Sequence, residues 1–515
     1  VLSMKKVFLL ACILLIGRSS YAQTWVNDAL TLFNKNQAVV LTINMRTFGA
    51  VDKDRNGIIQ KKKGEVSGNF DNAISRLDEI SALGVNTLHL LPINPVGKRR
   101  AKGTAGSLFA VKDLTAIDSN LGNPNSNSIL LLQVKDFVEA CHKRNIRVLV
   151  EMPAYGAYDL CLKKPRLFLK DKTRQSIVIP MQKDLRIFNA GTGATLNMDV
   201  YNLYEKYVDL LLSIDVDGVV VQDPYLKPAK FWKKLISYTK SQNQNFVFVA
   251  EMNKSQKRPK DVKVPYIGLR RIMNTGFDVY LGDFDNIVDW KFPEDVYKSV
   301  RNNQKFQNKF ANKKAVLADF NLYSNVAPIM VEDIYLSKMI IWLSSTLPVN
   351  AMYTDGFQTG DDYSFDWANL KALGSTTDDT KYYSERGKLD IYNFSRRPKG
   401  PYPELIDELK MANKFKLQMS ADMPNAEFVM LNTNYPDVFC YAMTDRITNH
   451  TVFVVGSFDM ENIKNVEIKV SGLNKKMIVK NVRNYAEPQL HRGKINTLLA
   501  PADIQVFEID KFAIK

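Results

Sequence analysis

The sequence predicts an α/β fold class, a (β/α)8 TIM barrel with a short inserted subdomain after its third strand and a C-terminal antiparallel β domain. Along most of the chain, short segments rich in β-branched residues alternate with segments of helical periodicity. One helix-strand spacing is too long, with about 45 residues between the third strand and the next helix. From about Pro424 onward, short strand patterns follow one another without helices. The 515 residues, 45% of them hydrophobic, suffice for a core of this size.

The first 22 residues have the pattern of a signal peptide. Met4-Lys5-Lys6 forms a basic start, residues 7–16 are continuously apolar, and Ser20-Tyr21-Ala22 has the small-x-small pattern of a cleavage site. The apolar run is too short to span a bilayer comfortably. We therefore expect an exported protein, periplasmic or extracellular, whose mature chain begins near Gln23.

Composition argues against several classes of function. The net charge is +16, but lysine and arginine are scattered, which disfavours nucleic-acid binding. The four histidines form no metal-binding pair, which argues against a zinc hydrolase. Cys12 lies in the signal segment, and the remaining Cys141, Cys161 and Cys440 are too widely spaced for a disulfide scaffold. Both a Cys141–Cys161 bridge and buried free thiols remain open.

We place the barrel at residues 23–420, with the insertion at about 154–198. Eight apolar segments fit its strands: 37–45, 85–92, 146–153, 218–222, 246–251, 277–281, 315–319 and 349–353. Four segments with helical periodicity lie between them: 69–83, 132–143, 201–214 and 228–239. Polar residues at the carboxyl ends of barrel strands are candidates for the functional site, because α/β barrels carry their chemistry there.

The C-terminal region, residues 421–515, is expected to form an antiparallel β-sandwich. Six strands are predicted at 427–431, 438–443, 451–457, 465–470, 477–479 and 504–508. No linker rich in glycine or serine separates this region from the barrel, so the two are expected to pack tightly.

A polar loop follows the first strand. Asp52, Asp54 and Asn56 place oxygen atoms at every second position before Gly57, a spacing that suits a hard cation such as Ca²⁺. The alternative is a turn rich in Asx residues without a metal.

Four stretches resemble the α-amylase superfamily, glycoside hydrolase family 13: 84–93 (GVNTLHLLPI), 106–114 (GSLFAVKDL), 347–356 (LPVNAMYTDG) and 393–398 (NFSRRP). The resemblance extends from about Val39 to the C-terminus. It implies an α-glucan or related oligosaccharide as partner, with Phe109 at a sugar-stacking position and Tyr155 and Tyr225 as further stacking candidates. It also extends the possible calcium ligands to the set Asp52, Asp54, Asn56, Ile58 and Gln60.

The position implied for the nucleophile departs from the family pattern. This family needs a carboxylate nucleophile and a protonated carboxyl group on opposite sides of the glycosidic bond. The fourth strand ends in Gln222 where an aspartate is expected, and Val220 replaces an arginine. An amide is a poor nucleophile. Asp223 is an outside candidate, but its side chain should point to the other face unless the strand bulges.

The other implied positions are partly retained. Glu251 ends the fifth strand, where the resemblance places the general acid/base. The third carboxylate position is occupied by Ser324, with Asp319 as an outside candidate. In the third strand Glu151 stands near an expected aspartate, and Tyr155 where an asparagine is expected.

Three hypotheses follow. The first is an exported amylase-like protein that binds α-glucan and is catalytically impaired by Gln222. The second is an active retaining hydrolase or transglycosidase with a rearranged site that uses Glu251 with Asp223 or Asp319. The third is a non-catalytic scaffold or protein-binding module on the same fold.

Overall fold

The computed structural model describes residues 28–54, 59–101, 106–171, 178–179, 182–254, 257, 265–284, 287, 290–319, 334–360, 402, 404–474, 476–483 and 487–515. The predicted signal peptide, Asn56, Ile58, Ser324 and the 393–398 stretch lie outside these residues. No described helix is both long enough and apolar enough to cross a membrane.

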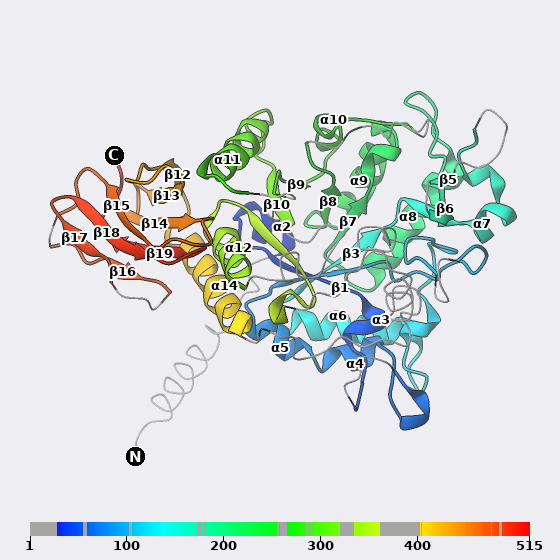
Figure 1. Cartoon of the computed structure of the whole chain (residues 1–515). Coiled ribbons are helices and arrows are strands. Elements are labelled where there is room, and N and C mark those ends of the chain that lie inside the picture. Colours follow the sequence, from blue (N-terminus) through cyan, green and yellow to red (C-terminus); the bar gives the residue numbers. More distant parts are fainter. Residues whose placement is uncertain are drawn as a thin grey trace, which may run out of the picture.

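Eight parallel strands close into a barrel in the order β1-β11-β10-β9-β8-β7-β3-β2 (Figure 1). The strands are β1 (Val39–Ile43), β2 (Thr87–Leu90), β3 (Arg147–Met152), β7 (Gly218–Gln222), β8 (Val247–Glu251), β9 (Val279–Leu281), β10 (Ala315–Asp319) and β11 (Asn350–Thr354). Their β-branched and apolar residues are buried on both faces, as parallel barrel strands require. The predicted fold class is confirmed.

Helices surround the barrel: α2 (Ala29–Asn34), α3 (Met45–Phe48), α4 (Phe70–Ile74), α5 (Leu77–Ala82), α6 (Leu130–His142), α8 (Met198–Ser213), α9 (Ala229–Gln242), α10 (Leu269–Met273), α11 (Pro293–Gln307), α12 (Ile334–Thr346) and α14 (Glu404–Asp422). Short 3-10 helices are η2 (Lys61–Lys63), η3 (Ser119–Leu121), η4 (Pro165–Leu167), η5 (Pro224–Leu226) and η7 (Phe357–Thr359). The single helix expected at 69–83 is divided into α4 and α5. It begins at Asn69, whose side chain accepts the Asn72 N–H at 2.9 Å.

The insertion after β3 contains β4 (Tyr155–Ala157), α7 (Tyr158–Lys163), β5 (Val178–Ile179) and β6 (Gln182–Ile187). Its strands form a small antiparallel sheet in the order β4-β6-β5. Because β3 ends at Met152 and β4 begins at Tyr155, the insertion stands directly at the carboxyl end of the barrel. It lies on the opposite side of the barrel from the C-terminal strands (Figure 1).

The C-terminal strands form two antiparallel sheets, β12-β13-β14-β19-β16 and β15-β18-β17. They are β12 (Glu427–Met430), β13 (Val438–Asp445), β14 (His450–Ser457), β15 (Lys464–Lys469), β16 (Lys480–Asn481), β17 (Gln489–His491), β18 (Lys494–Leu499) and β19 (Ile504–Asp510). The sequence reasoning missed β17 and β18. Their hairpin turns through Arg492 and Gly493, both with positive φ, and an Arg-Gly pair is a weak turn signal.

The barrel and the β domain share a packed interface. The Tyr297 side chain of α11 donates to the backbone oxygen of Cys440 at 2.9 Å and accepts its N–H at 2.8 Å. The Thr346 and Tyr441 hydroxyls are 2.6 Å apart. Buried residues of β13, β14 and β19 belong to the same apolar cluster as the barrel helices. Cys141, Cys161 and Cys440 are buried free thiols.

Candidate functional site

The candidate site lies at the carboxyl end of β3, β7 and β8. An apolar cluster fills the barrel interior and includes Leu149 of β3, Val220 of β7 and Val249 of β8. Because strand side chains alternate between faces, the residues two positions further on point to the same side. Those residues are Glu151, Gln222 and Glu251. Three polar side chains therefore stand above the apolar interior, on neighbouring strands.

Gln222 and Glu251 are direct neighbours in the sheet. They are register partners in the parallel β7–β8 pair, each at the last residue of its strand. The Gln222 amide is buried, and its oxygen accepts the N–H of Ala154 at 3.1 Å. The position implied for the nucleophile therefore holds a neutral amide that is already engaged by the backbone where the chain leaves β3.

Asp223 reaches the site by an unusual backbone conformation. Its φ is 41°, in the left-handed region that non-glycine residues rarely adopt, and Pro224 follows it directly. The carboxylate accepts hydrogen bonds from the hydroxyls of Tyr155 and Tyr225. Burial raises the pKa of Asp223, while these two bonds and the charge of Lys227 act in the opposite direction. The side chain thus faces the insertion and not the helix layer, which simple alternation along β7 did not predict.

Lys227 is a buried cation close to Asp223. Its ammonium lies 4.5 Å from the ring centre of Tyr204 and 5.6 Å from that of Trp232. Burial lowers the pKa of Lys227 to about 7, although attraction by Asp223 opposes this shift. The sequence reasoning did not single out this lysine, because a lysine after a strand usually lies in solvent.

Behind Glu251, a chain of polar groups runs across the strand ends. The Nε2 atom of His89 is 2.8 Å from Glu151, and its Nδ1 atom is 3.1 Å from the Thr42 hydroxyl. Burial lowers the pKa of His89 to about 3, so the ring is neutral. Burial raises the pKa of Glu151 well above its usual range, and the charge of Asp223 adds to this. A hydrogen bond with Glu251 acts in the opposite direction.

The aromatic candidates differ in what they offer a sugar. Phe109 is half-buried, which leaves part of its ring accessible. Tyr155 and Tyr225 are only 7% and 5% exposed, so their rings offer little stacking surface. Tyr225 packs against Tyr266, with ring centres 5.4 Å apart. The two buried tyrosines donate their hydroxyls to Asp223 and so hold its carboxylate in place.

Asp319 and Ser324 are the candidates for the third carboxylate position. Asp319 ends β10 and is the register partner of Met352 in β11, but its side chain lies outside the described residues. Ser324 lies outside them as well.

The polar loop brings Asp52 and Asp54 together with Glu65, with ligand atoms within 4.8 Å of one another. Glu65 also accepts backbone N–H groups of Lys53 at 3.0 Å and Gln60 at 2.7 Å, so it holds the loop ends together. The sequence reasoning missed Glu65 because it follows the loop and does not continue its alternation.

The donor chemistry of this loop fits calcium, since three carboxylates supply hard oxygen ligands. The Lys63 ammonium lies 2.6 Å from Asp54 and supplies a competing positive charge. Asn56 and Ile58, the other predicted ligands, lie outside the described residues.

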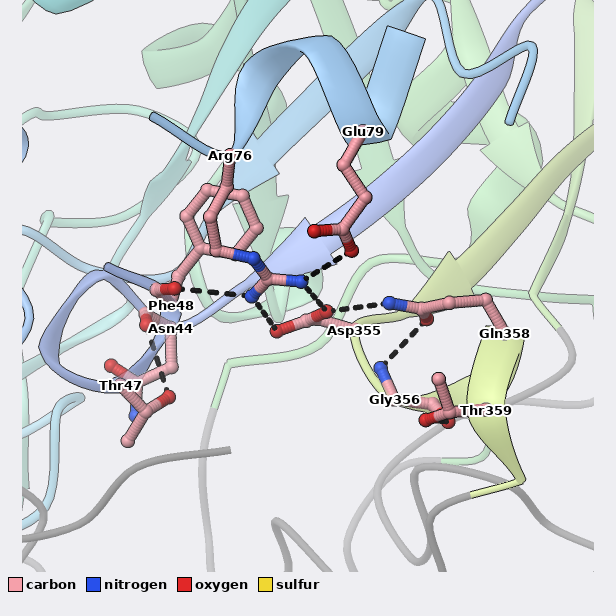
Figure 2. A network of polar contacts seen from close by, with 9 residues as sticks. All are labelled: Asn44, Thr47, Phe48, Arg76, Glu79, Asp355, Gly356, Gln358 and Thr359. Carbon is pink, nitrogen blue, oxygen red and sulfur yellow. Dashed lines mark hydrogen bonds and ion pairs between the residues drawn. The ribbon is translucent and has the colours of Figure 1, made fainter. Parts of the chain in front are cut away.

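A second polar network lies at the same end of the barrel, beyond β1 and β11 (Figure 2). The Arg76 guanidinium, just before α5, lies 3.2 Å from the carboxylate of Asp355, which follows β11. Arg76 also donates to the backbone oxygen of Phe48 at 3.1 Å and to Glu79 at 3.0 Å. The Gln358 amide donates to Asp355 at 2.9 Å. Each charge drawn in this network has a partner of opposite sign.

The comparisons with known proteins agree with this fold. No protein-family model matches the chain. An α-1,4-glucan:maltose-1-phosphate maltosyltransferase of Corynebacterium glutamicum is 24% identical over 79% of this chain and 58% of its own length. The enzyme of the same name from Bifidobacterium animalis subsp. lactis is 28% identical over 36% of this chain and 27% of its own. The matched stretches thus span less than two thirds of these relatives.

Solved α-amylases superpose on most of the chain. A noncanonic maltogenic α-amylase from Thermotoga neapolitana covers 93% of this chain and 99% of its own, with a TM-score of 0.68 and 18% identity. An α-amylase from Geobacillus thermoleovorans, complexed with acarbose, covers 92% and 98%, with a TM-score of 0.67 and 15% identity. These solved α-amylases therefore share the fold that the resemblance implied for this chain.

Proposed function

We propose that this chain is an exported α-glucan-binding protein whose barrel no longer cleaves glycosidic bonds efficiently. The observation that carries the proposal is Gln222, a buried amide at the tip of β7 beside Glu251. Retaining hydrolysis needs a negative charge at this point to attack and stabilise the sugar cation. The amide supplies none, and its oxygen is already bound to the Ala154 N–H.

Three findings support an oligosaccharide as the ligand. The sequence relatives are named for α-1,4-glucan and maltose-1-phosphate, and one structural neighbour contains acarbose. Glu251 is partly accessible at the end of β8 and can hydrogen-bond a sugar hydroxyl. Phe109, at the family's stacking position, keeps part of its ring exposed. Export rests on the signal pattern of the first 22 residues alone.

The direct test is calorimetric titration of residues 23–515 with maltoheptaose, beside a long incubation assayed for new reducing ends. We expect saturable binding without turnover, and weaker binding after Phe109→Ala. Turnover that is lost in Glu251→Gln and survives repurification would overturn the impairment. Absence of any binding to neutral α-glucans would shift the proposal to the scaffold alternative or to another sugar.

A gain-of-function variant sharpens this test. Gln222→Asp restores a carboxylate beside Glu251, and we expect it to raise hydrolysis above the wild-type background. Gln222→Asn is the matched control, because it shortens the side chain equally without adding charge. Equal activity in both variants would show that the amide is not what limits the reaction.

A second candidate function is favoured by Asp223. Its left-handed backbone brings a carboxylate into the same cluster as Glu151 and Glu251, where it influences the pKa values of Glu151 and Tyr155. In this alternative, Asp223 acts as nucleophile and Glu251 as acid. Any wild-type turnover should then fall sharply in Asp223→Asn, whereas the impairment hypothesis expects no turnover to lose.

A further inference from the structure

Glu151 is a buried carboxyl group that the proposed function does not use. It is 1% exposed and lies in the middle of the polar chain that begins at Thr42 and ends at Glu251. One of its oxygens faces the Nε2 atom of His89 at 2.8 Å. The other, Oε1, is buried and receives no hydrogen bond from an N–H or O–H donor of the described residues. The Glu151 side chain also forms a hydrogen bond with the carboxyl group of Glu251.

The groups around Glu151 do not supply a positive charge. His89 is neutral, and in the tautomer with its proton on Nε2 it donates to Glu151 and accepts the Thr42 hydroxyl at Nδ1. The Tyr207 hydroxyl of α8 donates to the backbone oxygen of Glu151 at 2.9 Å and not to its carboxylate. Asp223 adds a further negative charge. No lysine or arginine among the described residues forms an ion pair with Glu151.

Two carboxylates in contact cannot both be ionised in a buried site without a cation. One proton between them removes this conflict, because the protonated carboxyl group becomes a donor to the other. We propose that Glu151 and Glu251 share a single proton across the strand ends, with Glu151 as a positioning residue that acts on the ligand only through Glu251. The sharing depends on His89 being neutral. With no positive charge from His89, Glu151 and Glu251 together carry one proton and one negative charge.

The two carboxyl groups differ in their access to solvent. Glu151 is enclosed, whereas Glu251 is partly exposed at the last residue of β8. Protons therefore enter and leave through Glu251, and Glu151 acts as the buried partner. In the family pattern, a carboxylate beyond the seventh barrel strand accompanies the acid. Here a residue of the third strand takes a place beside it.

The test uses ligand-free protein labelled with [5-¹³C]glutamate and follows the carboxyl resonances from pH 4 to 9. We expect two glutamate resonances that shift together, with an apparent midpoint above the usual value of about 4.3. Glu151→Gln and Glu251→Gln assign them. Glu151→Gln should also lower the midpoint of the remaining Glu251 resonance, because a glutamine can donate to Glu251 without holding the proton.

Independent titration of the two groups, or a Glu251 midpoint unchanged by Glu151→Gln, would overturn the proposal. Glu427→Gln on β12, an exposed position, is the control and should leave both resonances in place. If Glu151→Gln fails to fold, Glu251→Gln provides the same test. The titration midpoint of Glu151 should then differ from its wild-type value.

A second readout is stability. A raised carboxyl pKa in the folded state means that the native protein holds a proton that the unfolded chain releases, so stability falls as pH rises from 5 to 8. Glu151→Gln should reduce this loss. The proposal rests on the proposed function only in assigning Glu251 to the sugar site. Because no sugar is present, these titrations can fail or succeed independently of glucan binding.

Discussion

The two polar networks at the carboxyl end of the barrel differ in how their buried charges are compensated. Beyond β1 and β11, Arg76 is surrounded by Asp355, Glu79 and a backbone carbonyl, so each charge has a partner (Figure 2). Beyond β3, β7 and β8, the acidic side chains of Glu151, Asp223 and Glu251 lie together. The charge of Lys227 acts on Asp223, but burial lowers the pKa of this lysine to about 7. In the first network the charges compensate one another, whereas in the second burial raises the pKa values of Glu151 and Asp223.

This difference in charge compensation supports the acidic cluster as the candidate site. Groups whose pKa is shifted by burial and by like charges are common at functional sites. Binding and catalysis need acids and bases whose pKa values differ from those in water. The replacement of an expected arginine by Val220 fits the same picture, since a guanidinium here would need a carboxylate that Gln222 no longer supplies.

The largest expected effect is on the paired network. Arg76→Met leaves the Asp355 carboxylate, which is 1% exposed, without its counter-charge. We expect a loss of about 3–5 kcal/mol in the free energy of unfolding, measured by urea denaturation. Glu79→Gln is the control, because this exposed partner should contribute less than about 1 kcal/mol. A loss below about 1 kcal/mol for Arg76→Met would remove the contrast between the networks.

A smaller effect is expected in the acidic cluster. Tyr155→Phe removes a hydrogen bond to Asp223, which should cost about 1.5–3 kcal/mol while that carboxylate is ionised. The pKa of Asp223, already raised by burial, should rise further, so the native state holds its proton to higher pH. The destabilisation should therefore be larger at pH 8 than at pH 5.

Tyr238→Phe provides the surface counterpart of this change. Its hydroxyl donates to Asp209 at 2.7 Å at an exposed site, where solvent replaces the lost bond. We expect only a small, nearly pH-independent change between pH 5 and 8. Equal pH dependence in both variants would show that the acidic cluster does not differ electrostatically from the protein surface.

The smallest effect concerns the loop of Asp52, Asp54 and Glu65, where Lys63 already supplies a counter-charge. We propose that Ca²⁺ binds there and expect millimolar Ca²⁺ to raise the melting temperature by about 2–4 °C relative to EGTA. Asp54→Asn should abolish the rise, and Lys63→Gln should enlarge it. No response in the Lys63→Gln protein would exclude the site.

Most of the fold could be predicted because barrel strands and helices leave local patterns. The eight strands lie within one or two residues of those expected in most cases, whereas β17 and β18 were missed because their Arg-Gly turn is atypical. The strand-end positions of Gln222 and Glu251 followed from the same local patterns, while their roles stay predictions.

The rest of the site depends on contacts that no local pattern encodes. The direction of Asp223 is set by one left-handed residue. The proximity of His89 to Glu151 joins residues 62 positions apart. Glu151 meets Glu251 across the intervening strand β7, which pairs with β3 on one side and with β8 on the other. Glu65 follows the polar loop directly, and its role depends on backbone N–H contacts that the spacing of the loop residues does not reveal.

The barrel seam has a consequence for how the chain folds. The buried Asn350 amide accepts the N–H of Ala38 at 2.9 Å and donates to the backbone oxygens of Phe33 and Val316 at 3.0 and 3.1 Å. One side chain of β11 thus joins α2, β10 and the residue directly before β1, across 312 residues of sequence from Ala38. During synthesis, one edge of β1 stays unpaired until β11 has been made. Pairing between strands so far apart in the sequence is slow. In pulsed hydrogen exchange during refolding, we expect the amides of this seam to become protected after those of the β7–β8 pair, where the strands are close in sequence.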